Sequence, residues 1–310
     1  MKTPAVQILL AVCNSSRFLR EQLDSLLAQD MPDFEILIRD GGSADDTMEI
    51  VAEYRRKNPE KIKVVGSGPA SAVENFSSLL AASAAPLVMF CDHDDVWKPD
   101  KIRVTVQKYR ELERRFGGDT PILIFTDSEV VDEDLAPLSP SMFRFQHLDA
   151  SRLELNRLIV QNIPYGNTML LNRALVDLAI PVPPEAVMHD HWVSLTAAAL
   201  GRIGFLDAPT LLYRQHGGNV YGAFRYSPAA MLAKVRRGRR QLRERFEENI
   251  RQAAEFGRRY GARLPERERE MFARLAHWDD LGFWGKRRLL WKYRIFKCGF
   301  LRNFGTFFII

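Results

Sequence analysis

Short apolar runs alternate with amphipathic segments over the first third of the chain. Residues 6–12 form an almost unbroken apolar run, which is typical of a strand buried on both faces of a sheet. Residues 18–29 then carry apolar side chains at helical spacing. The alternation continues with predicted strands at 34–40, 61–66 and 87–92 and predicted helices at 48–54, 71–83 and 99–115. Strands separated by single helices imply right-handed crossovers, and therefore an α/β fold with a mainly parallel central sheet and flanking helices.

The alternation loosens after residue 120. The predicted elements of this part are strands at 121–131 and 166–172, a loop at 138–150, a helix at 189–200, and two short strands within 201–216 that meet at a turn near Asp207–Pro209. Past Ser227–Pro228 the composition shifts to arginine-rich helical segments. The sequence therefore predicts an α/β domain over residues 1–227 and a basic amphipathic helical extension over residues 228–310.

Charge distinguishes residues 1–230, which we call the body, from residues 231–310, which we call the tail. Residues 231–310 carry 21 Lys and Arg against 9 Asp and Glu, a net charge of +12, whereas residues 1–230 carry 23 against 30, a net charge of −7. This asymmetry predicts an anionic partner for the tail and a cation or polar substrate for the body. Three widely separated cysteines argue against a disulfide framework or a zinc site and favour a reducing, cytoplasmic setting.

Neither a leader nor a spanning helix is expected. The N-terminal run has a single Lys in its first residues and no small-residue cleavage site after it, so we interpret it as the first strand. No stretch approaches the roughly 18 uncharged apolar residues that a membrane-spanning helix requires.

Three polar clusters follow predicted strands. They are Cys13-Asn14-Ser15, Asp40-Gly41-Gly42-Ser43 and Asp92-His93-Asp94-Asp95. In an open parallel sheet, ligands bind beyond the carboxyl ends of the strands, so these clusters should converge on one crevice. Paired glycines permit a tight turn, and we interpret Ser43 as the cap of the next helix with Asp46 in its first turn. Asp40 is positioned to accept a hydrogen bond from a nucleobase N–H.

The cluster Asp92-His93-Asp94-Asp95 supplies three carboxylates, which are hard oxygen ligands for a metal ion. Carboxylate oxygens select Mg²⁺ or Mn²⁺, which usually lie between one or two carboxylates and substrate phosphates. Strand alternation places Asp92 and Asp94 on one side and His93 on the other. Asp95 is expected to hold the loop or to begin the turn into the following helix, not to bind the metal.

These residues carry a resemblance to a known family. The segments ILLAVCNSSRFLREQLDSLLAQ, DGGSADDT, VENFSSLL and FCDHDDVWKPDKI, in this order and spacing, resemble a family 2 glycosyltransferase, and more narrowly the rhamnosyltransferase-like branch of bacterial surface-polysaccharide synthesis. The resemblance covers roughly residues 5–225. It implies a GT-A fold, a Rossmann-like nucleotide-sugar-binding domain.

The resemblance also implies site roles. Asp40 would contact the pyrimidine base, Asp92 would lie near the ribose, and Asp94 would bind the metal. Val12, Asn14 and Asn75 would join the donor site. Two positions depart from the family pattern: Gly41 stands where a second aspartate is usual, and Cys13 where an aromatic residue is usual.

The segment AVMHDHWVSL resembles the family's acceptor-side motif. Asp190 would then be the general base, which takes the proton of the acceptor hydroxyl in one inverting displacement. A helix N-terminus favours the carboxylate form, so Asp190 is expected to be ionised at neutral pH. The structural alternative is an N-cap aspartate with His189 and His191 in solvent. Trp192 is either a core residue or a platform under a sugar ring.

The segment YRQHGGN, residues 213–219, offers two further candidates. In similar enzymes a histidine here completes the metal shell, so His216 is a predicted ligand on a loop that could order over bound donor. Arg214 is predicted to offset diphosphate charge.

The basic tail interleaves Lys and Arg with Trp, Phe, Leu and Ile. This pattern is typical of an interfacial helix on an anionic leaflet, and predicts peripheral contact with the inner face of the cytoplasmic membrane. The alternative is a pair of helices packed on the body with a solvated basic face. Clustered aromatic and aliphatic residues argue against a nucleic-acid partner.

The sequence as a whole predicts a metal-dependent, inverting glycosyltransferase. By the resemblance it would move L-rhamnose from dTDP-L-rhamnose to a hydroxyl of a glycan or lipid-linked acceptor, with UDP-hexose donors as the next candidates. Two other classes stay open: a sugar nucleotidyltransferase, which shares the sheet and the metal, and a non-catalytic sugar-binding module.

Overall fold

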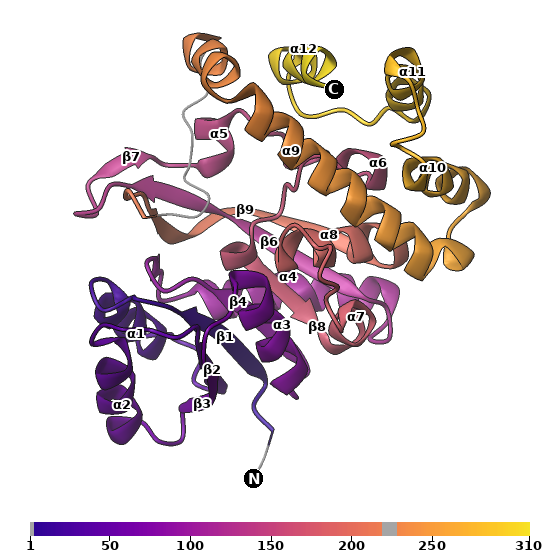
Figure 1. Ribbon diagram of the computed structural model, residues 1–310. Coiled ribbons are helices and arrows are strands. Elements are labelled where there is room, and N and C mark those ends of the chain that lie inside the picture. The colour runs from indigo at the N-terminus through magenta and orange to yellow at the C-terminus, as the bar shows by residue number, and fades with distance from the viewer. Residues whose placement is uncertain (1–2, 219–227) are drawn as a thin grey trace.

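The fold is built on one mixed sheet with helices on both faces (Figure 1). The computed structural model describes residues 3–218 and 228–310. Its strands are β1 (Val6–Val12), β2 (Phe34–Asp40), β3 (Ile62–Ser67), β4 (Leu87–Cys91), β5 (Val96–Trp97), β6 (Ile122–Val131), β7 (Pro137–Ser139), β8 (Met169–Asn172) and β9 (Arg202–Arg214). Its α-helices are α1 (Leu19–Leu27), α2 (Thr47–Lys57), α3 (Ala72–Ala82), α4 (Lys101–Phe116), α5 (Met142–Gln146), α6 (Leu155–Leu158), α7 (Arg173–Ala179), α8 (His189–Leu200), α9 (Pro228–Tyr260), α10 (Glu266–Ala276), α11 (Phe283–Tyr293) and α12 (Phe300–Ile309).

The first half of the sheet follows the predicted pattern. The strand order is β3-β2-β1-β4-β8-β6-β9-β5, and β1 pairs in parallel with both β2 and β4. Each of these strands is apolar along most of its length because helices cover both faces. The carboxyl ends of β1, β2 and β4 therefore lie side by side.

The second half is less parallel than predicted. Antiparallel pairs join β4 to β8, β8 to β6, and β9 to β5, while β6 and β9 are parallel. Residues 202–214 form one strand, so the prediction of two strands meeting at a turn is wrong. The register with β6 shifts at Asp127, which pairs with Pro209, and a bulge at this point absorbs the extra residues. The predicted loop at 138–150 contains the end of β7 and the short helix α5.

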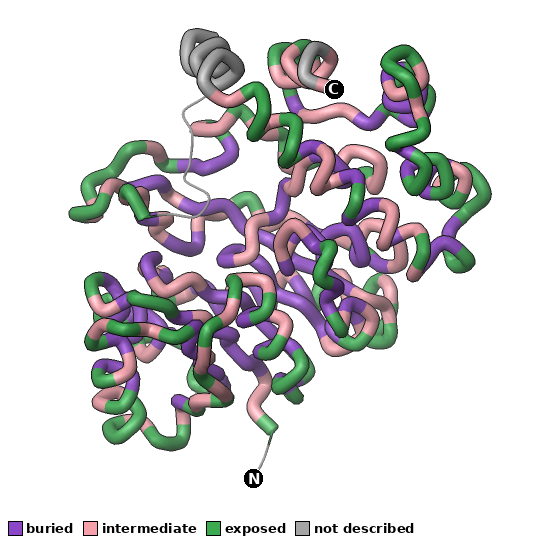
Figure 2. Tube along the Cα trace, viewed as in Figure 1, coloured by how far each residue is buried: buried purple, intermediate pink, exposed green. Residues whose placement is uncertain are grey.

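Two apolar cores lie on the two faces of the sheet. One packs β1, β2 and β4 against α1, α2 and α4. The other packs the opposite face against α3, α7 and α8, and continues without interruption into the C-terminal helices (Figure 2). The predicted boundary at 227/228 stays a prediction, since residues 219–227 lie outside the described ones.

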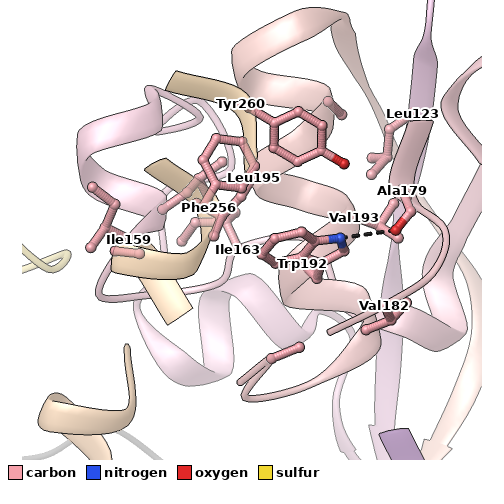
Figure 3. Close-up of a cluster of buried hydrophobic side chains, with 14 of the residues drawn as sticks. Leu123, Ile159, Ile163, Ala179, Val182, Trp192, Val193, Leu195, Phe256 and Tyr260 are labelled. Carbon is pink, nitrogen blue, oxygen red and sulfur yellow. Dashed lines mark hydrogen bonds between the residues drawn. The ribbon is translucent and has the colours of Figure 1, made fainter. Parts of the chain in front are cut away.

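Trp192 joins the sheet side of this core to α9. Its side chain is fully buried and its Nε1 donates to the carbonyl of Ala179 at 3.0 Å. The rings of Phe256 and Tyr260 lie beside it (Figure 3), with their centroids 5.4 and 5.9 Å from that of the Trp192 ring. Trp192 is therefore a core residue and not a platform for a sugar ring. The long helix α9 thus packs on the body, as the structural alternative for the tail proposed. No helix among the described residues is long and apolar enough to cross a membrane.

Candidate active site

The loops after β1 and β2 meet through direct hydrogen bonds. The backbone N–H of Asn14 donates to Ser43 Oγ at 2.9 Å, and Asn14 Oδ1 accepts from the N–H of Ala44 at 2.8 Å. Asn14 has a φ of 48°, a left-handed conformation that its short polar side chain tolerates. The predicted convergence of these two loops is therefore confirmed.

Asp40 is buried at the end of β2 and its carboxylate is already engaged. It accepts from the backbone N–H of Ser43 at 3.0 Å and from Ser43 Oγ at 2.6 Å. The interpretation of Ser43 as a helix cap is wrong, because α2 begins at Thr47 with Asp46 at the N-cap position. Ser43 instead ties the loop after β1 to Asp40.

Gly41 and Asn75 share one space. A Cβ atom at Gly41 would lie 2.7 Å from Asn75 Nδ2, so the amide occupies the place where the family's second aspartate would project. Arg39 donates to Asn75 Oδ1, and the N–H of Gly41 donates to the carbonyl of Val12 at 2.8 Å. The structure therefore brings the predicted donor-site residues Val12, Asp40 and Asn75 together.

The carboxylates after β4 lie close to the proposed base. Burial, together with the charges of Asp94 and Asp190, raises the pKa of Asp92 to about 8. Asp95 points elsewhere: it accepts from Asn167 Nδ2 at 2.6 Å and from the backbone N–H of Arg214 at 3.2 Å. It holds the loop, as predicted.

Asp94 and His216 form a close pair. His216 Nε2 lies 2.9 Å from Asp94 Oδ2, and the ring packs 4.8 Å from that of Phe18. The N–H of Gly218 donates to His216 Nδ1 at 3.1 Å, so a neutral ring carries its hydrogen on Nε2 and donates to Asp94. Ligation of a metal through Nε2 would require that hydrogen to leave.

The donor set fits a divalent cation that is completed by substrate. The described residues contain no group of three or more His, Cys, Asp or Glu side chains arranged to hold a metal ion. One carboxylate and one imidazole leave most positions of an Mg²⁺ or Mn²⁺ ion to diphosphate oxygens and water, which is how such ions are commonly bound beside nucleotides.

Arg214 lies behind the metal pair rather than in an open crevice. It is almost fully buried, and its Nε donates to the backbone carbonyl of Asp94 at 2.9 Å. Its terminal nitrogens donate to the carbonyl of Glu133 at 2.6 Å and to the carboxylate of Glu21. These contacts fix the backbone of the loop after β4. The predicted contact of Arg214 with diphosphate stays a prediction.

Asp190 lies in the first turn of α8, where two backbone groups hold its carboxylate. The N–H of Gly166 donates to Oδ2 at 3.0 Å and that of His191 to Oδ1 at 2.7 Å. Burial outweighs these donors and raises the pKa of Asp190 to about 6. A pKa of about 6 leaves Asp190 mainly ionised at neutral pH, as expected, although burial shifts the pKa in the opposite direction to the helix terminus.

The structural alternative for this motif is also wrong in its details. Met188, not Asp190, is the N-cap of α8, and both neighbouring histidines are buried. His191 Nε2 contacts the carbonyl of Leu158. His189 stacks on Phe76 at 3.8 Å, and burial lowers its pKa to about 3, so it is neutral. His189 is therefore a buried, uncharged neighbour of the proposed base.

Sequence reasoning missed the contribution of Gly166 and Asn167. Both lie in a 3₁₀ turn before β8, and they hold Asp190 and Asp95 respectively. A Cβ on Gly166 would lie 3.2 Å from His189 Nε2 and 3.4 Å from Asp190 Cβ. The glycine at the first position of the predicted strand at 166–172 was the one available signal of this close approach.

The parallel half-sheet, the converging loops and the carboxylates after β4 define a GT-A-type nucleotide-sugar-binding fold. Residues 7–156 match the family described as "Glycosyl transferase family 2", so the chain carries a glycosyltransferase domain of that family.

Relatives in sequence agree with this assignment. An uncharacterized glycosyltransferase of Nostoc sp. is 23% identical over 297 residues, which cover 92% of this chain and 88% of the relative. The dTDP-rhamnosyl transferase RfbG of Shigella flexneri is 24% identical over 228 residues, 69% of this chain and 74% of RfbG.

Two solved structures share the fold at lower identity. S. aureus TarS in complex with UDP-GlcNAc superposes with a TM-score of 0.56 at 18% identity, covering 93% of this chain and 91% of that one. Mannosyltransferase PcManGT from Pyrobaculum calidifontis, in complex with GDP-Man and Mn²⁺, gives 0.53 at 15% identity, covering 93% and 74%.

Proposed function

We propose that this protein is an inverting glycosyltransferase in which Asp190 is the general base and Asp94 and His216 hold a divalent cation. The observation that carries the proposal is the pair of Asp94 and His216, 2.9 Å apart, beside Asp92, whose pKa is raised by burial and by the charges of Asp94 and Asp190. Charges of one sign are brought together in this way at sites that bind cations and perform proton transfer.

The residues divide into a donor side and an acceptor side. Val12, Asn14, Asp40 and Asn75 would bind the base and ribose, with Asp92 near the ribose. Asp190 would accept the proton of the acceptor hydroxyl as that oxygen forms its bond to the anomeric carbon and the bond to the diphosphate breaks. A single displacement of this kind inverts the anomeric configuration.

The cation is Mg²⁺ or Mn²⁺. When bound, it would neutralise charge that develops on the leaving diphosphate. Asp94 and His216 would hold it, and Arg214 would fix the loop that carries Asp94 through the bond to its backbone carbonyl. Neutralisation of Asp94 would also remove one of the two charges that, in addition to burial, raise the pKa of Asp92.

L-rhamnose from dTDP-L-rhamnose is the proposed donor, and the similarity to RfbG supports it. A UDP-hexose is the second candidate, supported by the shared fold with TarS, whose structure contains UDP-GlcNAc. A thermal-shift screen of nucleotide sugars with and without Mn²⁺ separates them, because a ligand that binds the native state raises its melting temperature. The acceptor would be a hydroxyl of a glycan or of a lipid-linked precursor, and the enzyme would act at the inner face of the cytoplasmic membrane.

The proposal is tested by Asp190→Asn and Asp94→Asn, with Asp177→Asn on the exposed surface of α7 as the matched control. Loss of a general base lowers kcat by about 10²–10⁴-fold, while affinity for the nucleoside diphosphate should be retained in Asp190→Asn. Asp94→Asn should lose the effect of Mn²⁺ on donor binding, measured by calorimetry. Wild-type transfer by either variant would overturn its assigned role. A product containing a new diphosphate bond would instead identify a nucleotidyltransferase.

A further inference from the structure

Exposed aromatic side chains gather on the last two helices. Among the described residues, six of the eight exposed large hydrophobic side chains belong to α11 and α12. They are Phe283, Trp284, Trp291, Phe300, Leu301 and Phe304. Trp284, Trp291 and Phe300 have 74%, 67% and 78% of their surface exposed, so these rings lie in solvent. We call this set the aromatic surface.

The packing of α11 does not require the rings of Trp284 and Trp291. Leu289, Leu290 and Tyr293 face inward and belong to the main apolar core. Trp284 and Trp291 occupy a separate stripe seven residues apart on the outer side, with the exposed Arg288 between them. Exposed aromatic residues that contribute nothing to a core are unusual in a surface helix and indicate an interaction site.

The charge of this segment has one sign. Residues 283–310 contain seven Lys and Arg and no Asp or Glu. Several of the basic side chains, including Arg288 and Arg294, are exposed beside the aromatic surface. An anionic partner with an apolar interior satisfies both features, because basic groups near an anionic leaflet and aromatic rings at its interface each favour binding.

Arg287 holds α11 and α12 together as one unit. Its guanidinium donates to the carbonyls of Phe307 and Ile310 at 2.5 and 2.7 Å, and it lies 3.4 Å from the centroid of the Phe283 ring. The cation thus satisfies carbonyls in the last turn of α12, where positive charge is favourable. The two helices therefore present their exposed rings on a fixed support, which lies at the opposite end of the molecule from α2 (Figure 1).

The same helices reach the neighbourhood of the proposed base. The N–H of Cys298, between α11 and α12, donates to Gln161 Oε1 at 2.6 Å, and Arg302 donates to the carbonyl of His147 at 3.1 Å. Tyr165 is close enough to both Arg302 and Asp190 to feel their charges. A surface bound at α12 would therefore lie beside the acceptor side of the site.

We propose that the aromatic surface docks on an anionic lipid bilayer, and that it brings a lipid-linked acceptor hydroxyl to Asp190. The second clause rests on the proposed function, whereas docking itself does not. A second copy of this chain is a poorer occupant, since residues 283–310 of each copy contain seven Lys and Arg and no Asp or Glu, and the two segments would repel.

Flotation with vesicles tests the docking. Wild-type protein should float with phosphatidylcholine vesicles that contain phosphatidylglycerol and float much less with phosphatidylcholine alone. Trp284→Ser combined with Phe300→Ser should abolish flotation. The matched control is Leu138→Ser, an exposed apolar residue on β7 outside the aromatic surface, and it should float like wild type.

Substitution of the basic residues gives an independent test of docking. Each basic residue near an anionic leaflet strengthens binding about fivefold, so Arg288→Gln with Arg294→Gln should weaken the partition coefficient roughly thirtyfold. Equal flotation of the wild type and of all these variants overturns the proposal, as does a dimer in lipid-free sedimentation that the Trp284→Ser, Phe300→Ser variant loses. Turnover with a soluble acceptor should be unchanged in every variant. If it is absent from the wild type too, the proposed function has failed while the docking result stands.

Discussion

The rate of transfer should fall steeply as the pH drops from 7 to 5, because Asp190 must be ionised to accept a proton. Burial raises its pKa to about 6, against two backbone donors that favour the carboxylate. With that value, roughly nine-tenths of the molecules carry the carboxylate at about pH 7, half at about pH 6 and one-tenth at about pH 5. The enzyme should therefore be active above the raised pKa and lose activity below it. We expect kcat to fall about tenfold between pH 7 and pH 5. An aspartate with an ordinary pKa would still be roughly nine-tenths ionised at pH 5 and would show almost no loss.

Gly166→Ala should shift the fall in kcat at acid pH, which we call the acid limb, to higher pH. The added Cβ would lie 3.2 Å from His189 Nε2 and 3.4 Å from Asp190 Cβ, so the turn or His189 must give by a few tenths of an ångström, and we expect the bond from the Gly166 N–H to the carboxylate to lengthen. Loss of a donor to the charged form raises the pKa of a carboxyl group.

The measurement is kcat against pH at saturating donor, acceptor and Mn²⁺, for the wild type and Gly166→Ala. The diphosphate of a nucleotide sugar has no proton to lose near pH 6, so the fall in kcat reports the titration of a group on the protein and not of the donor. A profile that is flat from pH 7 to pH 5 would refute the assignment of Asp190. A limb near pH 6 that stays in place in Gly166→Ala would refute the role given to the Gly166 N–H.

Two substitutions test packing and donor binding. Trp192→Ala should lower the free energy of unfolding by about 3–5 kcal/mol, because it removes a fully buried side chain between α8 and α9; urea denaturation measures this, and a loss below about 1 kcal/mol would contradict the structure. Gly41→Ala should displace the amide of Asn75, 2.7 Å from the new Cβ, and weaken binding of the nucleoside diphosphate about fivefold in calorimetry, as expected for one lost hydrogen bond. Unchanged affinity would remove Asn75 from the donor site.

The N-terminal half of the fold could be predicted because its strands are buried on both faces. A continuous apolar run such as Val6–Val12 leaves little freedom in where the strand lies. The second half could not be predicted as well, because Pro209 resembles a turn residue in sequence. Its pairing with Asp127 across a bulge depends on β6, which is far away along the chain.

The site shows the same division. Asp92 and Asp94 could be proposed because carboxylates at the end of a strand are visible as residue types, and Asp190 could be proposed because its segment resembles a family motif. The groups that hold Asp190 are backbone N–H donors, and residue type does not reveal these. The balance between those donors and burial, which sets its pKa near 6, also depends on α8 packing against the sheet.

One apolar core runs from the sheet through Trp192 to α9. This core limits how segments of related proteins can be exchanged to change the preference for an acceptor. The carbonyls of Ile180 and Pro181 accept from Arg259 on α9, and the N–H of Val187 donates to Gln252 Oε1 at 2.9 Å, so α9 also holds the segment that leads into Asp190. A graft joined at the end of the matched family region, residue 156, would divide none of these contacts. One joined between α8 and α9 would combine a proposed base from one parent with its support from another. Recombination should therefore treat the base and the C-terminal helices as a single inherited block.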